Sequence, residues 1–275
     1  MRFRISLSTP LSLMVLCSAF GCEPAIERDV RLFKERGGSI GRDKSRAEQP
    51  IILARLSGEK FSNSDLVLLL KWSELQEVFL GGTKVTDSGI QQLKELHHLE
   101  RLSVGAGDID GSGFTSLNGL QKLRLLQLSN TKMSDDSLKY LAGLANLDEL
   151  YLANNKIVGD GLGSLQALTK LQFLQLHGCP ITDFGLKSIS GLKSLRKLFL
   201  SETKITDSGL EHIKDLKYLE TLSLSGTKVS DAGLIHLHGL KSLRELTVIS
   251  TAVTIDGGKE LRKYLPEVRV VIVAD

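Results

Sequence analysis

The sequence predicts an α/β solenoid, in which one strand–turn–helix unit is stacked on copies of itself. Three observations support this prediction: a motif that recurs at multiples of 24 residues, strand-like alternation at the start of each unit, and helix-like spacing at its end. The motif copies are KVTDSGI (84–90), KMSDDSL (132–138), PITDFGL (180–186), KITDSGL (204–210) and KVSDAGL (228–234). A period of this length indicates a repeat architecture rather than a compact domain with a single core.

Nine such units fit between residues 52 and 267. Their first residues are Ile52, Gln76, Glu100, Arg124, Asp148, Gln172, Arg196, Glu220 and Arg244, and we count repeat positions 1 to 24 from each of them. Positions 3 and 5 are apolar in almost every unit, as Leu174 and Leu176 illustrate. Alternation with a period of two over about five residues predicts a half-buried strand.

The second half of each unit has a different spacing. Positions 15, 18, 21 and 24 are apolar, for example Leu210, Ile213, Leu216 and Leu219. A spacing of three places these side chains on one face of a short helix or helical turn. Stacked units therefore predict a parallel sheet on one wall of the solenoid and helices on the other.

The turn between strand and helix carries recurrent polar residues and glycines. Position 12 holds Asp87, Asp135, Asp183, Asp207 and Asp231, with Asn63 in the first unit. A carboxylate there can accept the free N–H groups that open its own helix, so we expect helix caps. Glycine at position 14, as in Gly209, predicts close packing between adjacent coils. Position 8 is mostly Thr or Asn, and we expect these side chains to bond the backbone of the next coil.

The combined pattern L-x-L-x-x-[TN]-x-[IV]-[TS]-D-x-G-L-x-x-L resembles a leucine-rich repeat. Its D-x-G-L form is similar to repeats of planctomycete-like bacterial proteins and of the cysteine-containing F-box subtype. The resemblance covers residues 52–267 and implies a right-handed arc or horseshoe with a concave parallel β-sheet and short convex helices. It also implies a module that binds other macromolecules, and it specifies no particular partner.

The N-terminus is typical of an export signal. Arg2 and Arg4 precede an apolar stretch, and the segment ends in Ala19-Phe20-Gly21-Cys22, which resembles a bacterial lipobox. We expect residues 1–21 to be a signal peptide and Cys22 to be lipidated, which predicts a membrane-anchored envelope lipoprotein. The lipobox has Ala and Phe where Leu and a small residue are usual, so simple cleavage and secretion is the alternative. No later segment reaches the roughly 20 apolar residues that span a bilayer.

Both ends of a solenoid need a cap, because a terminal coil would otherwise expose its core. Residues 22–51 are predicted to be a tether and capping segment, with a helix over 25–36 and extended chain over 39–42 and 50–56. The mixed charges of residues 43–48 predict a solvated loop. At the other end, residues 268–275 are predicted to form a capping strand after the helix-breaking Leu265-Pro266.

Charge and cysteine content exclude two classes of protein. Loss of Arg2 and Arg4 takes the formal net charge from +3 to +1, and this balance argues against nucleic acid as the main partner. Only Cys22 and Cys179 follow the signal segment, so a disulfide framework is not expected. The register places Cys179 at position 8, which predicts a small buried residue.

The search for catalytic or metal chemistry gives no convincing set. The six histidines are scattered, and the turn serines and aspartates are explained by the repeat. Residues 105–113 contain Asp108-Ile109-Asp110-Gly111, a pattern shared with calcium loops, yet only two carboxylates converge and the bidentate Glu is missing. We therefore predict a non-enzymatic protein with no cofactor and no metal, and a divergent turn at this loop.

The candidate binding residues come from strand parity. If positions 3 and 5 face the core, positions 2, 4 and 6 face the concave surface. The partner-binding residues predicted in this way are Tyr151, Phe173, His177, Phe199, Phe79, Arg101, Glu149 and Lys197. Of these, Tyr151, Phe173, His177 and Phe199 come from three consecutive strands and should form one patch of exposed aromatics, as binding anchors do. The alternative is that neighbouring side chains merely cover one another on the sheet.

These observations favour a protein-binding module of the bacterial cell envelope that recognises a protein partner through its concave sheet. The alternative hypothesis is a structural envelope spacer that associates with itself through an exposed terminal strand. An enzyme would require a convergent acid–base or metal set that the repeat register does not supply.

Overall fold

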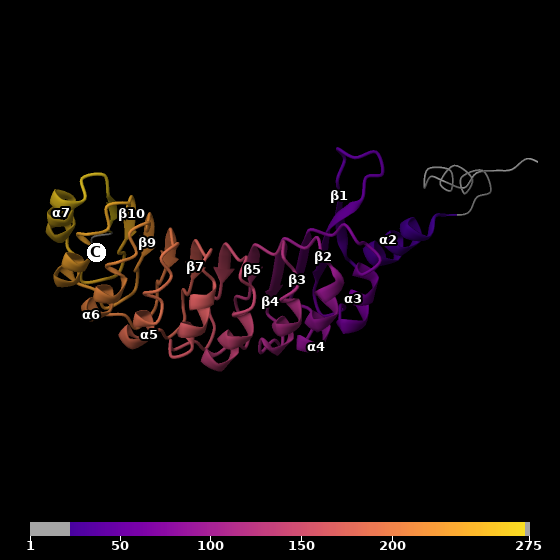
Figure 1. Ribbon diagram of the computed structural model, residues 1–275, viewed down its shortest axis with the longest axis horizontal. Helices are drawn as coiled ribbons and strands as arrows, with labels where there is room; N and C mark the ends of the chain where they lie inside the picture. The colour runs from indigo at the N-terminus through magenta and orange to yellow at the C-terminus, as the bar shows by residue number, and fades with distance from the viewer. Residues whose placement is uncertain (1–22, 273–275) are drawn as a thin grey trace, which may run out of the picture.

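The computed structural model describes residues 23–272 as a curved solenoid, with the strands on the inner side of the arc and the helices on the outer side (Figure 1). Its 11-stranded sheet follows chain order from β1 to β11. Strands β2 to β11 are parallel, and β1 alone is antiparallel to its neighbour. The predicted fold class is therefore confirmed. The predicted signal peptide, Cys22 and the last residues of the predicted C-terminal strand lie outside the described residues.

The N-terminal end is closed by a helix and a hairpin. Helix α2 (Ala25–Glu35) precedes strands β1 (Ser39–Arg42) and β2 (Ile51–Ser57), as expected. Phe33 of α2 is buried, and its ring meets that of Trp72 edge-on at 5.2 Å. Two ion pairs join this helix and its C-cap residue Arg36 to the first unit, Arg36 to Asp65 at 2.6 Å and Lys71 to Asp29 at 2.8 Å.

The remaining strands recur in strict register. They are β3 (Glu77–Gly81), β4 (Arg101–Gly105), β5 (Leu125–Gln127), β6 (Glu149–Tyr151), β7 (Phe173–Gln175), β8 (Lys197–Phe199), β9 (Thr221–Ser223), β10 (Glu245–Thr247) and β11 (Arg269–Val271). Each residue pairs with the residue 24 positions later, for example Leu150 with Leu174. The sequence period is thus the pairing register.

The outer wall consists of short helices, in which η denotes the 3₁₀ type. They are α3 (Asn63–Leu69), α4 (Asp87–Ile90), η1 (Gln91–Glu95), η2 (Ser112–Leu117), η3 (Asp135–Leu141), η4 (Leu162–Ala167), α5 (Asp183–Lys187), α6 (Asp207–Leu210), η5 (Glu211–Ile213), η6 (Asp231–Leu237) and α7 (Ile255–Tyr264). The apolar spacing of three explains the 3₁₀ segments, because a helix with three residues per turn keeps such positions on one face.

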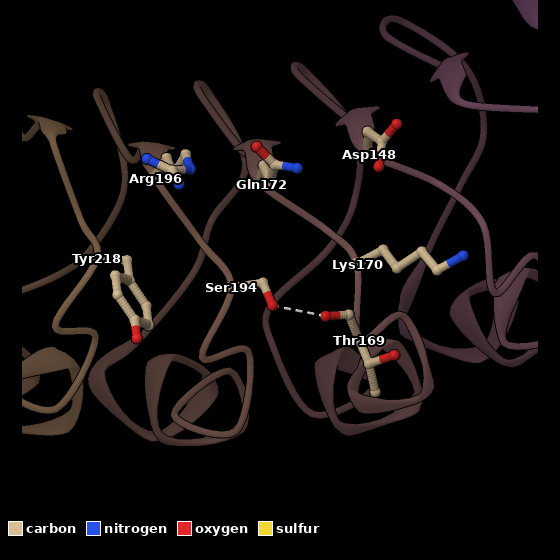
Figure 2. A pocket seen from close by; sticks show the side chains of 7 residues that line it. All are labelled: Asp148, Thr169, Lys170, Gln172, Ser194, Arg196 and Tyr218. Atoms are coloured by element: carbon tan, nitrogen blue, oxygen red, sulfur yellow. Dashed lines mark hydrogen bonds between the residues drawn. The ribbon is translucent and has the colours of Figure 1, made fainter.

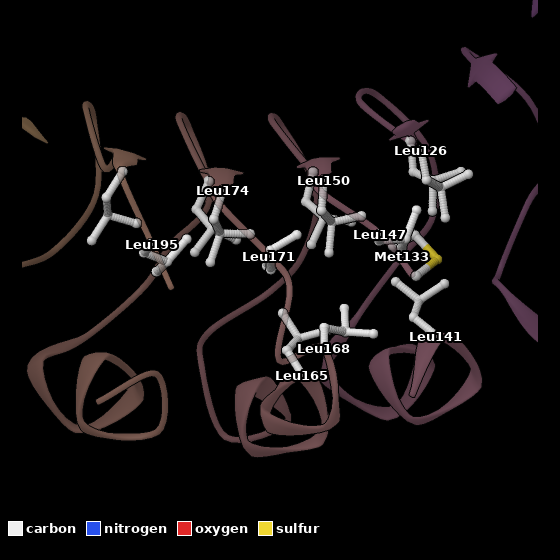
Figure 3. Packing of buried hydrophobic residues seen from close by; sticks show 14 of the residues in the cluster. Leu126, Met133, Leu141, Leu147, Leu150, Leu165, Leu168, Leu171, Leu174 and Leu195 are labelled. Carbon is white, nitrogen blue, oxygen red and sulfur yellow. The ribbon is translucent and has the colours of Figure 1, made fainter. Parts of the chain in front are cut away.

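Leucines from both walls fill the space between sheet and helices. Figure 3 shows Leu150 and Leu174 of successive strands pointing toward Leu165 and Leu168 of the intervening return, and all four are fully buried. The buried residues form one continuous cluster from Val30 to Val270. The predicted core positions are confirmed.

The turn aspartates do not cap their own helices as expected. In seven of the nine units the N-cap residue is Thr or Ser at position 11, as at Thr182 before α5. Asp183 instead accepts hydrogen bonds from the backbone N–H and the hydroxyl of Thr206 in the next coil, at 2.8 and 2.6 Å. The expectation was wrong because stacking places the next turn, with its unpaired N–H groups, directly beside this carboxylate.

The glycines of position 14 lie at the close approach that was predicted. A Cβ atom at Gly161 would come within 2.1 Å of the Asp135 carbonyl oxygen. The position-8 threonines differ from expectation, since Thr203 donates to Leu200 of its own coil at 2.7 Å. Asn155 does link coils, and its amide donates to the carbonyl of Leu128 in the preceding coil at 2.7 Å.

One recurrent feature was not predicted. Position 7 adopts a left-handed backbone conformation in all nine units, with φ between 53° and 87°. The residues are Gly58, Gly82, Ala106, Asn130, Asn154, Gly178, Glu202, Gly226 and Ser250. Gly and Asn tolerate this conformation, and the other three residues do so at a cost of roughly 1–2 kcal/mol each. This residue lies in the turn that follows each strand.

The C-terminal end is formed by α7 and β11. Val268 and Val270 are buried, as the alternation predicts, and Ile272 packs against the core. In residues 23–272, no helix has the length and apolar content needed to cross a membrane.

Candidate functional site

The concave face of the central coils holds a row of aromatic side chains. Gln175 of β7 pairs in register with Tyr151 of β6 on one side and with Phe199 of β8 on the other. Phe173 lies two residues earlier on β7, so its ring is diagonal to both neighbours. On a sheet, diagonal neighbours are within reach when the side chains are aromatic.

The three rings contact one another. The Phe173 ring centroid is 4.5 Å from that of Tyr151 and 5.0 Å from that of Phe199. The interplanar angles of 33° and 34° give tilted stacks within the distance range of favourable aromatic pairs. All three residues remain partly exposed. Packing and exposure therefore coexist in this row, which we call the aromatic row (Tyr151, Phe173 and Phe199).

Polar groups flank one end of the aromatic row. The hydroxyl of Tyr151 donates to Glu149 Oε2 at 2.7 Å. Burial of the phenol, followed by this hydrogen bond to a carboxylate, raises the pKa of Tyr151 to about 12, while nearby Arg101 acts in the opposite direction. Glu149 and Arg101 thus lie close to the aromatic row. At the other flank, exposed Lys197 pairs in register with Phe173.

His177 lies at the rim, two residues beyond the end of β7. Its Nε2 atom is 3.9 Å from a carboxylate oxygen of Glu202, and Glu202 is one of the residues in the left-handed conformation. Phe79 lies on β3, three strands away from β6 in the sheet. There the Arg55 guanidinium sits 4.7 Å from the Phe79 ring centroid. Six of the eight predicted residues therefore form one central cluster, His177 lies at its rim, and Phe79 is separate from it.

A second surface feature lies at the edge of the sheet where the strands begin, and sequence reasoning missed it. A hollow of about 370 Å³ is lined by Asp148, Thr169, Lys170, Gln172, Ser194, Arg196 and Tyr218. In Figure 2, Asp148, Gln172 and Arg196 lie at the starts of successive strands, and Lys170, Ser194 and Tyr218 lie on the segments leading from the helices. The sequence does hold one indication of this feature. Tyr218 stands between Leu216 and Leu219, at a repeat position that is not part of the buried apolar set.

The remaining chemical groups are held in structural roles. Cys179 is buried, its thiol donates to the Leu152 carbonyl at 3.2 Å, and burial raises its pKa above the ordinary thiol value. A thiol in this state is a poor nucleophile. Among residues 23–272, no group of three or more His, Cys, Asp or Glu side chains could hold a metal ion.

The divergent loop uses its acidic residues within the protein. Asp87 accepts from the backbone N–H groups of Asp110, Gly111 and Gly113 at 2.8 to 3.0 Å. Asp108 pairs with Lys132 at 2.8 Å. The loop is therefore one more copy of the coil-to-coil contact seen at the other turns.

The family model described as leucine rich repeat matches residues 97–157, 121–181 and 169–229. Together with the parallel strand ladder, this match decides the family. The chain is a leucine-rich-repeat protein. Proteins built from these repeats are typically interaction modules, and this one presents its central aromatic row on the strand face.

Solved structures of bacterial leucine-rich-repeat proteins share the fold. Internalin C2 of Listeria monocytogenes is 24% identical, with 77% of this chain and 84% of that chain covered and a TM-score of 0.57. A leucine-rich-repeat protein of Leptospira interrogans is 21% identical, with 74% and 56% covered and a TM-score of 0.56. No curated protein matches the sequence. At these sequence identities, the two solved structures show that the fold is shared and nothing more.

Proposed function

We propose that this leucine-rich-repeat protein is a non-enzymatic module of the bacterial cell envelope that binds a protein partner through its concave face. The observation that carries the proposal is the aromatic row, in which three stacked rings remain partly exposed. Aromatic side chains are the commonest anchors of protein interfaces, since they bury a large area at a small entropic cost. Glu149, Arg101 and Lys197 around the row would set the polarity of the partner.

The location in the envelope is part of the same proposal. It rests on the basic and apolar N-terminus and on the lipobox-like segment before Cys22. A lipid on Cys22 would attach the chain to the membrane close to the start of helix α2 at Ala25.

A capture experiment in the native host tests the proposal. A photo-crosslinking amino acid replaces Gln175, which lies between Tyr151 and Phe199. The control variant carries the same group at Lys214, which lies on the helical wall and pairs with Glu211 at 3.3 Å. We expect the Gln175 variant alone to capture a distinct protein, which is then purified and shown to bind the unmodified chain. Capture at Lys214 and not at Gln175 would contradict the proposal.

A second candidate function is self-association through a terminal strand. The strand order of residues 23–272 leaves β1 and β11 each with one neighbour in the sheet, and an unpaired strand edge can pair with another chain. In the capture experiment this function would yield a second copy of the chain rather than a distinct protein. Light scattering of the purified protein would then show a dimer or a longer assembly.

A further inference from the structure

The edge where the strands begin carries two adjoining hollows that share one tyrosine. The first hollow, of about 370 Å³, is the one drawn in Figure 2. A second of about 340 Å³, lined by Lys193, Asp215, Lys217 and Tyr218, shares the Tyr218 side chain with it. Tyr218 is 61% exposed. A large aromatic side chain exposed beside concave surfaces can serve as a contact for a ligand.

Three lysines occupy repeat position 22 in three successive coils of the same edge. They are Lys193, Lys217 and Lys241, and all are exposed. Lys241 donates to the carbonyl of Tyr264 at 3.0 Å. In residues 23–272, no carboxylate forms an ion pair with any of the three, although Asp215 lines the second hollow beside Lys217. Neighbouring coils repeat at roughly the strand spacing of about 4.8 Å, so the three ammonium groups repel one another.

Other charged groups along this edge are already engaged. Arg196 pairs with Glu220, and Lys170 Nζ donates to Asn146 Oδ1 at 2.6 Å. The lysine row therefore supplies an uncompensated positive charge in the middle of the edge, beside Tyr218. Such a row attracts counter-ions or an anionic ligand.

The opposite edge, where the strands end, provides an internal comparison. It also has lysines at position 9, of which Lys84 pairs with Glu59 and Lys132 with Asp108. Among the described residues, no carboxylate forms an ion pair with the other four, which are Lys60, Lys156, Lys204 and Lys228. The coil-to-coil aspartates, such as Asp183 and Asp207, lie on the same side. Of the surfaces described above, only the edge where the strands begin, which we call the starting edge, carries the hollows around Tyr218.

We propose that the starting edge, formed by Lys193, Lys217, Lys241 and Tyr218, binds the phosphate groups of an anionic phospholipid surface. Lysine is a point charge suited to phosphate, and basic residues attract a protein to anionic lipids additively. A tyrosine with a wet hydroxyl and an apolar ring is favoured at the membrane interface. A row along one edge fits a flat array of headgroups. With this edge on the membrane, the concave face opens sideways and stays free, so the inference is independent of partner binding there.

The test is co-sedimentation of the full chain with vesicles of phosphatidylcholine, with and without phosphatidylglycerol. Every variant carries Cys22→Ser, so that lipidation does not contribute. The measured quantity is the gain in vesicle affinity caused by phosphatidylglycerol, because an apolar leader would bind both vesicles alike. The site variant is Lys193→Glu/Lys217→Glu. Its matched control is Lys204→Glu/Lys228→Glu, which makes the same charge change in adjacent coils on the opposite edge.

We expect the phosphatidylglycerol-dependent affinity of the site variant to fall by about thirty-fold or more. Each of the two lysines removed should account for a factor of about five. The control should change it by less than about threefold. Tyr218→Ala should weaken binding while leaving net charge unchanged, and circular dichroism checks that each variant is folded. Three results would overturn the proposal: equal losses in the two double variants, no dependence on phosphatidylglycerol, or binding of soluble linear polyphosphate without binding of vesicles.

Discussion

The carboxylate of Asp207 accepts two hydrogen bonds from Ser230, one from its backbone N–H at 2.7 Å and one from its hydroxyl at 2.6 Å. The two residues are 23 positions apart and belong to successive coils. The same contact joins Asp183 to Thr206 and Asp231 to Thr254. The aspartates of the motif are therefore links in a ladder along the solenoid, and each is needed by the coil that follows it.

This ladder predicts a larger effect than the loss of a helix cap. Asp207→Ala should lower the free energy of unfolding by about 2–3 kcal/mol, because hydrogen bonds to a charged acceptor are worth roughly 1.5–3 kcal/mol. The stability of Asp207→Asn should lie between that of the unmodified protein and that of Asp207→Ala, because the amide oxygen of Asn can still accept a hydrogen bond. Urea denaturation measures both. The control is Asp256→Ala, an exposed residue that pairs with Lys259, which should cost less than about 0.5 kcal/mol. A loss at Asp207 no greater than at Asp256 would show that the ladder is dispensable.

A pair of glycines tests the packing between coils. Gly161→Ala places a Cβ atom 2.1 Å from the Asp135 carbonyl oxygen, so the coils must separate, and we expect a loss of about 2–3 kcal/mol or more. Gly163 lies two residues later, in η4, and a Cβ atom added there would meet no other atom within 4 Å. Gly163→Ala should raise stability by about 0.4–1 kcal/mol, because it restricts the unfolded chain. Thermal unfolding that ranks the two variants in the opposite order would contradict the stacking geometry.

The ionisation of Tyr151 gives a pH-dependent prediction. Its pKa is raised from 10.0 to about 12, so the unfolded chain loses this proton at a lower pH than the folded protein. The stabilisation is present in full below pH 10 and is lost as pH rises through the folded value of about 12. Ultraviolet titration of the four tyrosines, compared with Tyr151→Phe, should identify one late-titrating group. Glu149→Gln should lower its pKa, and an unchanged titration in that variant would remove the carboxylate from the explanation.

The aromatic row predicts how binding and stability separate. Tyr151→Ala and Phe199→Ala should each weaken partner binding by roughly 1–2 kcal/mol or more if the row is the interface. Phe173→Ala should do the same and also cost more stability than the other two, since it loses two ring contacts instead of one. Affinity for the captured partner is measured beside thermal unfolding. Lys214→Ala should change neither, and equal affinities for Tyr151→Ala and Lys214→Ala would move the interface away from the concave sheet.

The proposed anchor gives the last prediction. Mass spectrometry of protein extracted from the membranes of the native host should show a diacylglyceryl group on Cys22. Cys22→Ser should release the chain from the membrane unless the lysine edge retains it, and high salt, which screens surface charges, should then complete the release. An unmodified N-terminus in the soluble fraction would exclude the anchor.

The sequence alone determined the solenoid, its register and its core. This was possible because the period of 24 residues is also the pairing register of the sheet, so that Leu150 meets Leu174 and every leucine at one repeat position has the same environment. The parity of the strands likewise placed Tyr151, Phe173 and Phe199 on one face, and the structure brings their rings into contact.

Only the tertiary structure decided which atoms meet between coils. The bond from Ser230 to Asp207 depends on the offset between stacked units, and the left-handed residue at position 7 depends on how the chain turns after each strand. The tyrosine-centred hollows at the starting edge depend on the same offset, because residues of three successive coils line the first hollow and residues of two line the second. A repeat fixes what each unit contributes to the solenoid, whereas the distance and angle between units arise from how the leucine side chains pack.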